Sequence, residues 1–152
     1  MKVRNILVPV DYSESGDAAI DYAVSLAREY DAELHLVHVY LPPYTNIDAG
    51  FTGYTLPSDL PPVDINAEEA RLERIKPAED VKFRHEFIVG SPNDELVNYA
   101  KQNEIDLVVM GTHGRTGLTR LLMGSVAEAV VRQAPCPVLT IKQPAQALQE
   151  TA

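Results

Sequence analysis

The stretch IDLVVMGTHGRTGLTRLLMGSVAE, residues 105–128, decides how this chain folds. It starts with a short apolar run, passes through a segment with four glycines and ends in apolar residues at helical spacing. A continuous apolar run is typical of a strand that is buried on both faces of a sheet. The stretch therefore predicts a buried strand at about 106–110, a glycine-rich connection and a helix through Ala134, with the inward residues Val126, Ala127, Val130 and Val131.

The rest of the chain repeats this alternation of strand and helix. Further strands are predicted at about 6–10, 34–40, 81–89 and 137–141. Further helices are predicted after Ser13, at about 64–76 and after Ser91. In the first of these helices the apolar residues that share one face are Ala19, Tyr22, Ala23, Leu26, Ala27 and Tyr30.

This element order predicts one α/β domain over residues 1–142 and a flexible tail at 143–152. Alternating strands and helices form a parallel sheet, doubly wound, and here it has five strands with four helices on both faces. In such a sheet, ligands bind beyond the carboxyl ends of the strands, where the winding direction reverses. The ends of the first and fourth strands are therefore the first place to look for a site.

Bulk properties exclude several classes of protein. The chain has 152 residues and a formal net charge of -9, which argues against general binding of nucleic acid. No apolar segment reaches the roughly 20 residues of a membrane helix, so no membrane insertion is expected. A single cysteine, Cys136, excludes an internal disulfide, and no leader-like segment opens the sequence. The expected compartment is the cytoplasm.

The glycine-rich segment has the chemistry of an anion site. Glycine lets a backbone approach a ligand closely, and a helix start presents free N–H groups to phosphate. Arg115 and Arg120 are the only charged side chains between Asp106 and Glu128. The alternative is a loop that glycines merely shape, and the glycine count alone does not separate the two. The segment is neither a P-loop nor the dinucleotide-binding fingerprint.

The spacing Gly111-x2-Gly114-x9-Gly124-Ser125 resembles the G-2x-G-9x-G-(S/T) signature of the ATP-binding subgroup of the universal stress protein family. Residues 6–11, 90–92 and 134–139 are similar to that family's first strand, its entry to the third helix and its approach to the last strand. The resemblance implies the strand order 3-2-1-4-5, which places the reversal of winding between strands one and four.

The resemblance also implies how a nucleotide, ATP or AMP, would lie. Asp11 would face the adenosine end, and Val39 would offer backbone hydrogen bonds to adenine. The remaining contacts to base and ribose would come from Pro9, Val10, Met110 and Gly111. The phosphates would meet His113, Gly114, Arg115, Gly124, Ser125 and Val126. No protein ligands for a metal are implied, and any Mg²⁺ would be held through the phosphates.

Several of these residues also have a purely structural interpretation. An Asp after a strand often caps the next helix, but Ser13 is placed to cap it, which favours ligand contact for Asp11. His113 is either a loop histidine or a ligand contact. The strand histidines have no metal-ligand spacing and are predicted to be packing or surface residues: His35, His38 and His85.

The remaining candidates favour structural roles. Cys136 lies between two prolines and is predicted to be a small buried residue rather than a reactive thiol. Residues 41–63 contain five prolines and are too broken for a regular element, so they form a lid or an irregular loop. The aromatic residues of this segment either anchor it or stack on a base: Tyr44, Phe51 and Tyr54. The acidic residues expected on a solvated helix face are Glu68, Glu69 and Glu73.

The expected function is regulatory binding of ATP or AMP rather than fast catalysis. Phosphoryl transfer needs a base or a water-positioning residue and usually carboxylates that hold a metal, and the motif supplies none. A slow ATPase or phosphotransferase and a nucleotide-independent scaffold are the alternatives. A homodimer is predicted through Val138–Lys142, because this strand is an apolar edge in the implied order and the family commonly dimerises there. A further protein partner would be of unknown identity.

Overall fold

The computed structural model describes residues 1–42, 64–112 and 123–142. Within these ranges strands and helices alternate along the chain. They are β1 (Asn5–Pro9), α1 (Glu14–Tyr30), β2 (Glu33–Tyr40), α2 (Ile65–Glu73), β3 (Phe83–Val89), α3 (Pro92–Gln102), β4 (Leu107–Gly111), α4 (Ser125–Gln133) and β5 (Val138–Ile141). Every predicted strand and helix is confirmed, with small shifts at the ends. The predicted loop from residue 43 onward and the predicted tail lie outside the described residues.

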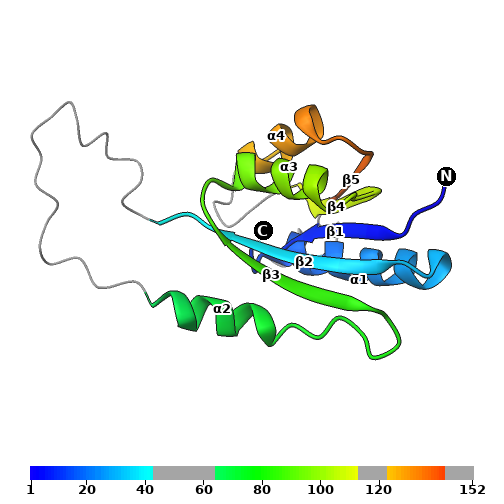
Figure 1. The fold of residues 1–152 in the computed structure, drawn as a ribbon, viewed down its shortest axis with the longest axis horizontal. Coiled ribbons are helices and arrows are strands. Elements are labelled where there is room, and N and C mark those ends of the chain that lie inside the picture. The colour runs from blue at the N-terminus through cyan, green and yellow to red at the C-terminus, as the bar shows by residue number, and fades with distance from the viewer. Residues whose placement is uncertain (43–63, 113–122, 143–152) are drawn as a thin grey trace, which may run out of the picture.

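The strands form one parallel sheet in the order β3-β2-β1-β4-β5. The predicted fold class and strand order are therefore confirmed. Figure 1 shows α1 and α2 on one side of the sheet and α3 and α4 on the other. The chain changes sides between β3 and β4, so the winding reverses between β1 and β4, which are neighbours in the sheet.

Two apolar cores explain why the central strands read as continuous apolar runs. Ile6 and Val8 of β1 pack in the core under α1 and α2, whereas Leu7 packs in the core under α3 and α4. All three side chains are fully buried. In β4, Val108 and Val109 divide between the two cores in the same way. A strand that is covered on both faces has no solvent side, so its sequence shows no alternation.

The inward faces of two helices differ from the prediction. Tyr22 and Tyr30 of α1 were predicted inward but are 56% and 47% exposed. The buried side is a row of small residues, Ala19, Ala23 and Ala27, with Ile20 and Val24 beside it. Alanines let the helix axis approach the sheet, and the large rings are left at its flank. In α4 the prediction for Val131 was also wrong, because this residue is 45% exposed on the outer side of the helix.

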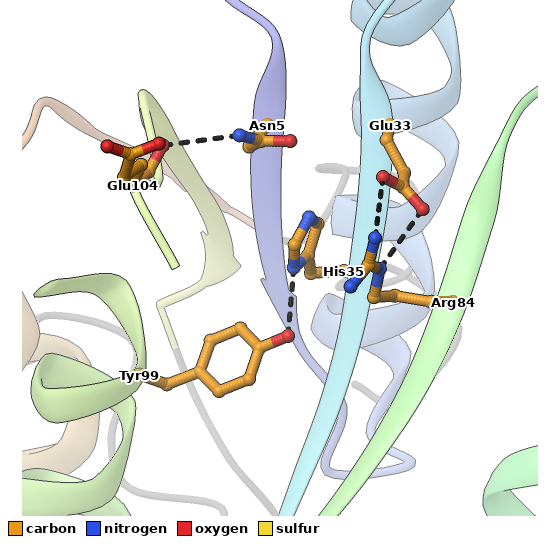
Figure 2. A network of polar contacts seen from close by, with 6 residues as sticks. All are labelled: Asn5, Glu33, His35, Arg84, Tyr99 and Glu104. Carbon is orange, nitrogen blue, oxygen red and sulfur yellow. Dashed lines mark hydrogen bonds and ion pairs between the residues drawn. The ribbon is translucent and has the colours of Figure 1, made fainter. Parts of the chain in front are cut away.

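A buried histidine–tyrosine pair fastens α3 to the sheet. Nδ1 of His35, on β2, lies 2.8 Å from the hydroxyl of Tyr99, on α3 (Figure 2). His35 is only 3% exposed, and its Nε2 has no hydrogen-bond partner among the described residues. At the neighbouring surface, Arg84 donates two hydrogen bonds of 3.0 Å to the Glu33 carboxylate. The pair thus joins the two layers of the fold, and its outer neighbours are charged.

Burial keeps both members of this pair neutral. It lowers the pKa of His35, and the positive charge of Arg84 lowers it further. Burial also raises the pKa of Tyr99 to about 12. An imidazolium at position 35 would place a second N–H donor, on Nε2, where no acceptor is described.

We therefore expect acid to destabilise the protein partly through His35. The unfolded histidine has an ordinary pKa of about 6.5, so below that pH the unfolded chain binds more protons and stability falls with falling pH. Substituting His35→Gln removes the titration and leaves a group that can bond to Tyr99. Urea unfolding at about pH 7.5 and about pH 5.5 should show the wild type losing more stability than the variant. An equal loss of stability in the wild type and in His35→Gln would contradict this account. The control is the same substitution at another strand histidine, His85→Gln.

Candidate functional site

A cavity of about 360 Å³ opens at the carboxyl ends of β1, β2 and β4. The first turns of α3 and α4 and one residue of α2 complete its wall. Every predicted site residue that the structure describes lines this cavity: Pro9, Val10, Asp11, Val39, Met110, Gly111, Gly124, Ser125 and Val126. Three further predicted residues, His113, Gly114 and Arg115, lie outside the described residues. The structure thus brings together segments that are far apart in the sequence.

The start of α4 lies at the cavity and has backbone N–H groups without partners inside the helix. Gly124 is the N-cap residue, with extended backbone angles, and no side chain caps this helix. The Gly124 N–H donates to the Thr112 carbonyl at 2.7 Å, and the first intrahelical bond runs from Glu128 N to Gly124 O. The N–H groups of Ser125, Val126 and Ala127 therefore have no partner within the helix. All three residues line the cavity.

Two packing constraints hold α4 and β4 in this arrangement. Thr112 is buried, and its N–H donates to Ile141 O at 3.0 Å, so residue 112 is fixed to β5 while it accepts from Gly124. At Gly111, an added Cβ would lie 2.8 Å from the carbonyl carbon of Ser15 on α1. Glycine is therefore required there because α1 crosses the end of β4 at close range, whatever its role toward a ligand.

Asp11 fixes the turn after β1 and also lines the cavity. Its Oδ1 accepts hydrogen bonds from the Ser13 N–H at 3.0 Å and from the Ser13 hydroxyl at 2.5 Å. Ser13 in turn accepts from the Gly16 N–H at 3.1 Å and is the N-cap of α1, as predicted. A Cβ on Gly16 would lie 2.7 Å from Asp11 Oδ1, so this glycine leaves room for the carboxylate. Asp11 thus supports the cap rather than forming it.

An aromatic group beside Asp11 was not predicted from the sequence. Tyr12 has a φ of 62°, a left-handed conformation that is unusual for a bulky residue. Its ring lies 5.0 Å from the ring of His38 and 3.8 Å from the guanidinium carbon of Arg71 on α2. His38 is buried, as predicted for a packing residue, and its Nδ1 donates to Val10 O at 2.6 Å. No local pattern signals this cluster, because its members come from the β1–α1 turn, β2 and α2.

The predicted solvated face of α2 needs one correction. Glu69 and Glu73 are exposed, as expected, but Glu68 is half-buried and lines the cavity. Asp11 and Glu68 are the acidic residues of the described lining, and that lining contains no lysine or arginine. Within the described residues, no group of three or more histidine, cysteine, aspartate or glutamate side chains could hold a metal ion. Cys136 is half-buried, and burial raises the pKa of its thiol, in keeping with a packing role.

Comparison with known proteins identifies the family. The profile of the universal stress protein family matches residues 2–142. This chain belongs to the universal stress protein family. A universal stress protein of Methanocaldococcus jannaschii is 38% identical over 144 residues, which cover 93% of this chain and 83% of the relative.

Solved universal stress proteins have the same fold. UspA from Lactobacillus plantarum matches with a TM-score of 0.69 and 28% identity, over 93% of this chain and 99% of that one. A universal stress protein solved in complex with cAMP matches with a TM-score of 0.65 and 26% identity, over 93% and 98% of the two chains. Within the part of this universal stress protein that the structure describes, no helix has the length and hydropathy of a membrane span.

The close approach of α1 to β4 gives a test of the site's framework. We expect Gly111→Ala to destabilise the fold by about 1–3 kcal/mol, because the new methyl group meets the Ser15 backbone, which cannot rotate away. Gly90→Ala is the matched control, since a Cβ there meets the flexible side chain of Glu95. Urea unfolding should show the larger loss for Gly111→Ala. Similar losses in the two variants would show that the helix can shift without cost.

Proposed function

We propose that this universal stress protein binds ATP or AMP in the cavity and places the phosphates at the start of α4. One observation carries the proposal: Ser125, Val126 and Ala127 present adjacent N–H groups to the cavity without intrahelical partners. Such groups, together with the positive end of the helix dipole, form an anion site. The Ser125 hydroxyl adds a further donor on the same turn.

Other observations support a nucleotide as the ligand. The cavity volume of about 360 Å³ falls in the range of small-molecule pockets. The lining residues Val10, Val37 and Val39 give its wall an apolar surface against which a base can pack. Gly111, Gly124 and Ser125 stand at the motif positions of the ATP-binding subgroup, while Gly114 lies outside the described residues. A solved member of the family holds cAMP.

The chemistry around α4 favours binding over turnover. Glu128 is the first carboxylate after the motif, and it would be the nearest candidate for a base on this helix. It is exposed, and its Oε1 lies 2.8 Å from Nη2 of Arg132, one turn further along α4. Glu128 does not line the cavity, so α4 brings no carboxylate to its wall. We therefore propose a regulatory role, in which the bound nucleotide alters the surface that the protein presents to a partner.

A homodimer through β5 is part of this proposal. β5 is an edge strand of the sheet, so one row of its backbone groups has no neighbouring strand within the described residues. Leu139 on β5 and Val131 on α4 are large apolar side chains that are exposed in the single chain. Pairing of two copies along β5 would satisfy the backbone groups and cover this apolar surface.

Substitution at the helix start tests the nucleotide site. Gly124 has φ -61° and ψ 157°, angles that valine also adopts, so Gly124→Val should leave the fold intact. The added side chain stands where phosphate would meet the backbone. Because each charge-assisted hydrogen bond contributes about 1.5–3 kcal/mol, we expect the affinity for AMP and ATP to fall by about 100-fold or more. Calorimetry measures the affinity, and circular dichroism checks the fold.

Ala129→Val is the matched control, because it also introduces a valine, at a position of α4 that is outside the cavity lining. It should bind AMP as the wild type does. Unchanged affinity in Gly124→Val would show that the phosphates lie elsewhere. No binding of AMP or ATP by the wild type would overturn the proposed function as a whole.

A further inference from the structure

The wall of the cavity opposite α4 is formed in part by α2, which lies on the other side of the sheet (Figure 1). Glu68, in the first turn of α2, is the residue of this helix that reaches the cavity. Its neighbours on the helix, Glu69 and Glu73, face solvent. One of three similar carboxylates is therefore singled out by the packing of α2.

Contacts on both sides of α2 fix the position of Glu68. Leu72, one turn later, is buried in the core between α2 and the sheet. Arg71, also one turn later, lies with its guanidinium carbon 3.8 Å from the centre of the Tyr12 ring. Beyond the helix, Nε2 of His85 donates to Ile75 O at 2.7 Å and ties the segment to β3. Because residues three and four apart share one helix face, these anchors turn Glu68 toward the cavity.

The Glu68 carboxylate has no hydrogen bond or ion pair with any residue in the described ranges. The other carboxylate of the lining, Asp11, is already bonded to Ser13 through Oδ1. An ionised carboxylate only accepts hydrogen bonds. A ligand that covers Glu68 must therefore supply an N–H or O–H group, or the carboxylate loses water without compensation.

The two sides of the cavity consequently have opposite preferences. The start of α4 offers three N–H donors and the positive end of a helix dipole, which favour an anion. The α2 side offers an acceptor with a negative charge, which repels phosphate and favours a donor. A molecule that matches both sides has phosphate at one end and hydrogen-bond donors at the other.

We propose that Glu68 is a specificity-determining residue, whose carboxylate accepts a hydrogen bond from an amino or hydroxyl group of the nucleoside half of the ligand. This inference rests on the proposed nucleotide site and names what that site selects. In a 5′-nucleotide of adenine, the available donors are the exocyclic amino group and the ribose hydroxyls. Analogues that lack the matching donor should be rejected, because a site with an unpaired polar group penalises them strongly.

A double-mutant cycle between protein and ligand tests the proposal. Calorimetry compares AMP with purine riboside 5′-monophosphate, 2′-deoxy-AMP and 3′-deoxy-AMP, each of which lacks one donor. The wild type should bind one of these analogues about tenfold or more weakly than AMP. In Glu68→Ala that penalty should shrink to about twofold or less, because the acceptor is gone. The analogue whose affinity penalty shrinks in Glu68→Ala identifies whether the amino group or a ribose hydroxyl donates to Glu68.

Glu69→Ala is the matched control, because it removes the same charge from the next residue of α2 outside the cavity lining. It should keep the wild-type penalty. Alanine is a good helix former, so α2 should persist in both variants, and circular dichroism checks this. If AMP binds and the analogue penalties are the same in the wild type and in Glu68→Ala, the role of Glu68 is overturned while the proposed function stands. If the wild type does not bind AMP, both fail.

Discussion

The parallel pairing of β1 with β4 is the constraint on which the site depends. These strands are distant in sequence, yet Ile6 pairs with Leu107 and Leu7 with Val108 at the centre of the sheet. Each βαβ crossover is right-handed, so placing β4 beside β1 sends the later helices to the opposite side from α1 and α2. The helix that follows β1 therefore lies on one side of the sheet, and the helix that follows β4 lies on the other. The cavity lies beyond the carboxyl ends of β1 and β4, where the winding reverses.

Backbone groups and close packing give this cavity its chemistry. Thr112 is bonded to β5 and accepts a hydrogen bond from Gly124, so the start of α4 is held next to the end of β4. On the other side, Arg71 and Leu72 hold α2 so that Glu68 reaches the wall. A donor-rich side and an acceptor side thus face each other within one pocket. That polarity follows from the fold and requires no lysine or arginine among the described lining residues.

The sequence predicted the strands and helices well because their apolar patterns are local signals: the central strands are continuous apolar runs, and the helices have apolar residues at helical spacing. The strand order came from the family resemblance. The prediction failed for Tyr22 and Tyr30, because a helical face that includes large rings cannot be told from one that places alanines against a sheet. The ends of β1 and β4 and the glycine-rich motif were expected as a site from the fold and the residue pattern, and the individual contact residues were implied by the family resemblance. Tyr12 and Glu68 were missed because both depend on the packing of α2, which no short-range pattern reports. Tyr12 is contacted by Arg71 of that helix, and Glu68 lines the cavity.

The central claim is that the phosphates of a bound nucleotide meet the N–H groups at the start of α4. An amide NMR titration tests it most directly, because it reads those N–H groups individually. On addition of AMP, the amide signals of Ser125, Val126 and Ala127 should shift strongly, and adenosine, which lacks the phosphate, should leave them nearly unmoved. Saturable binding of AMP with these three signals unchanged would contradict the account.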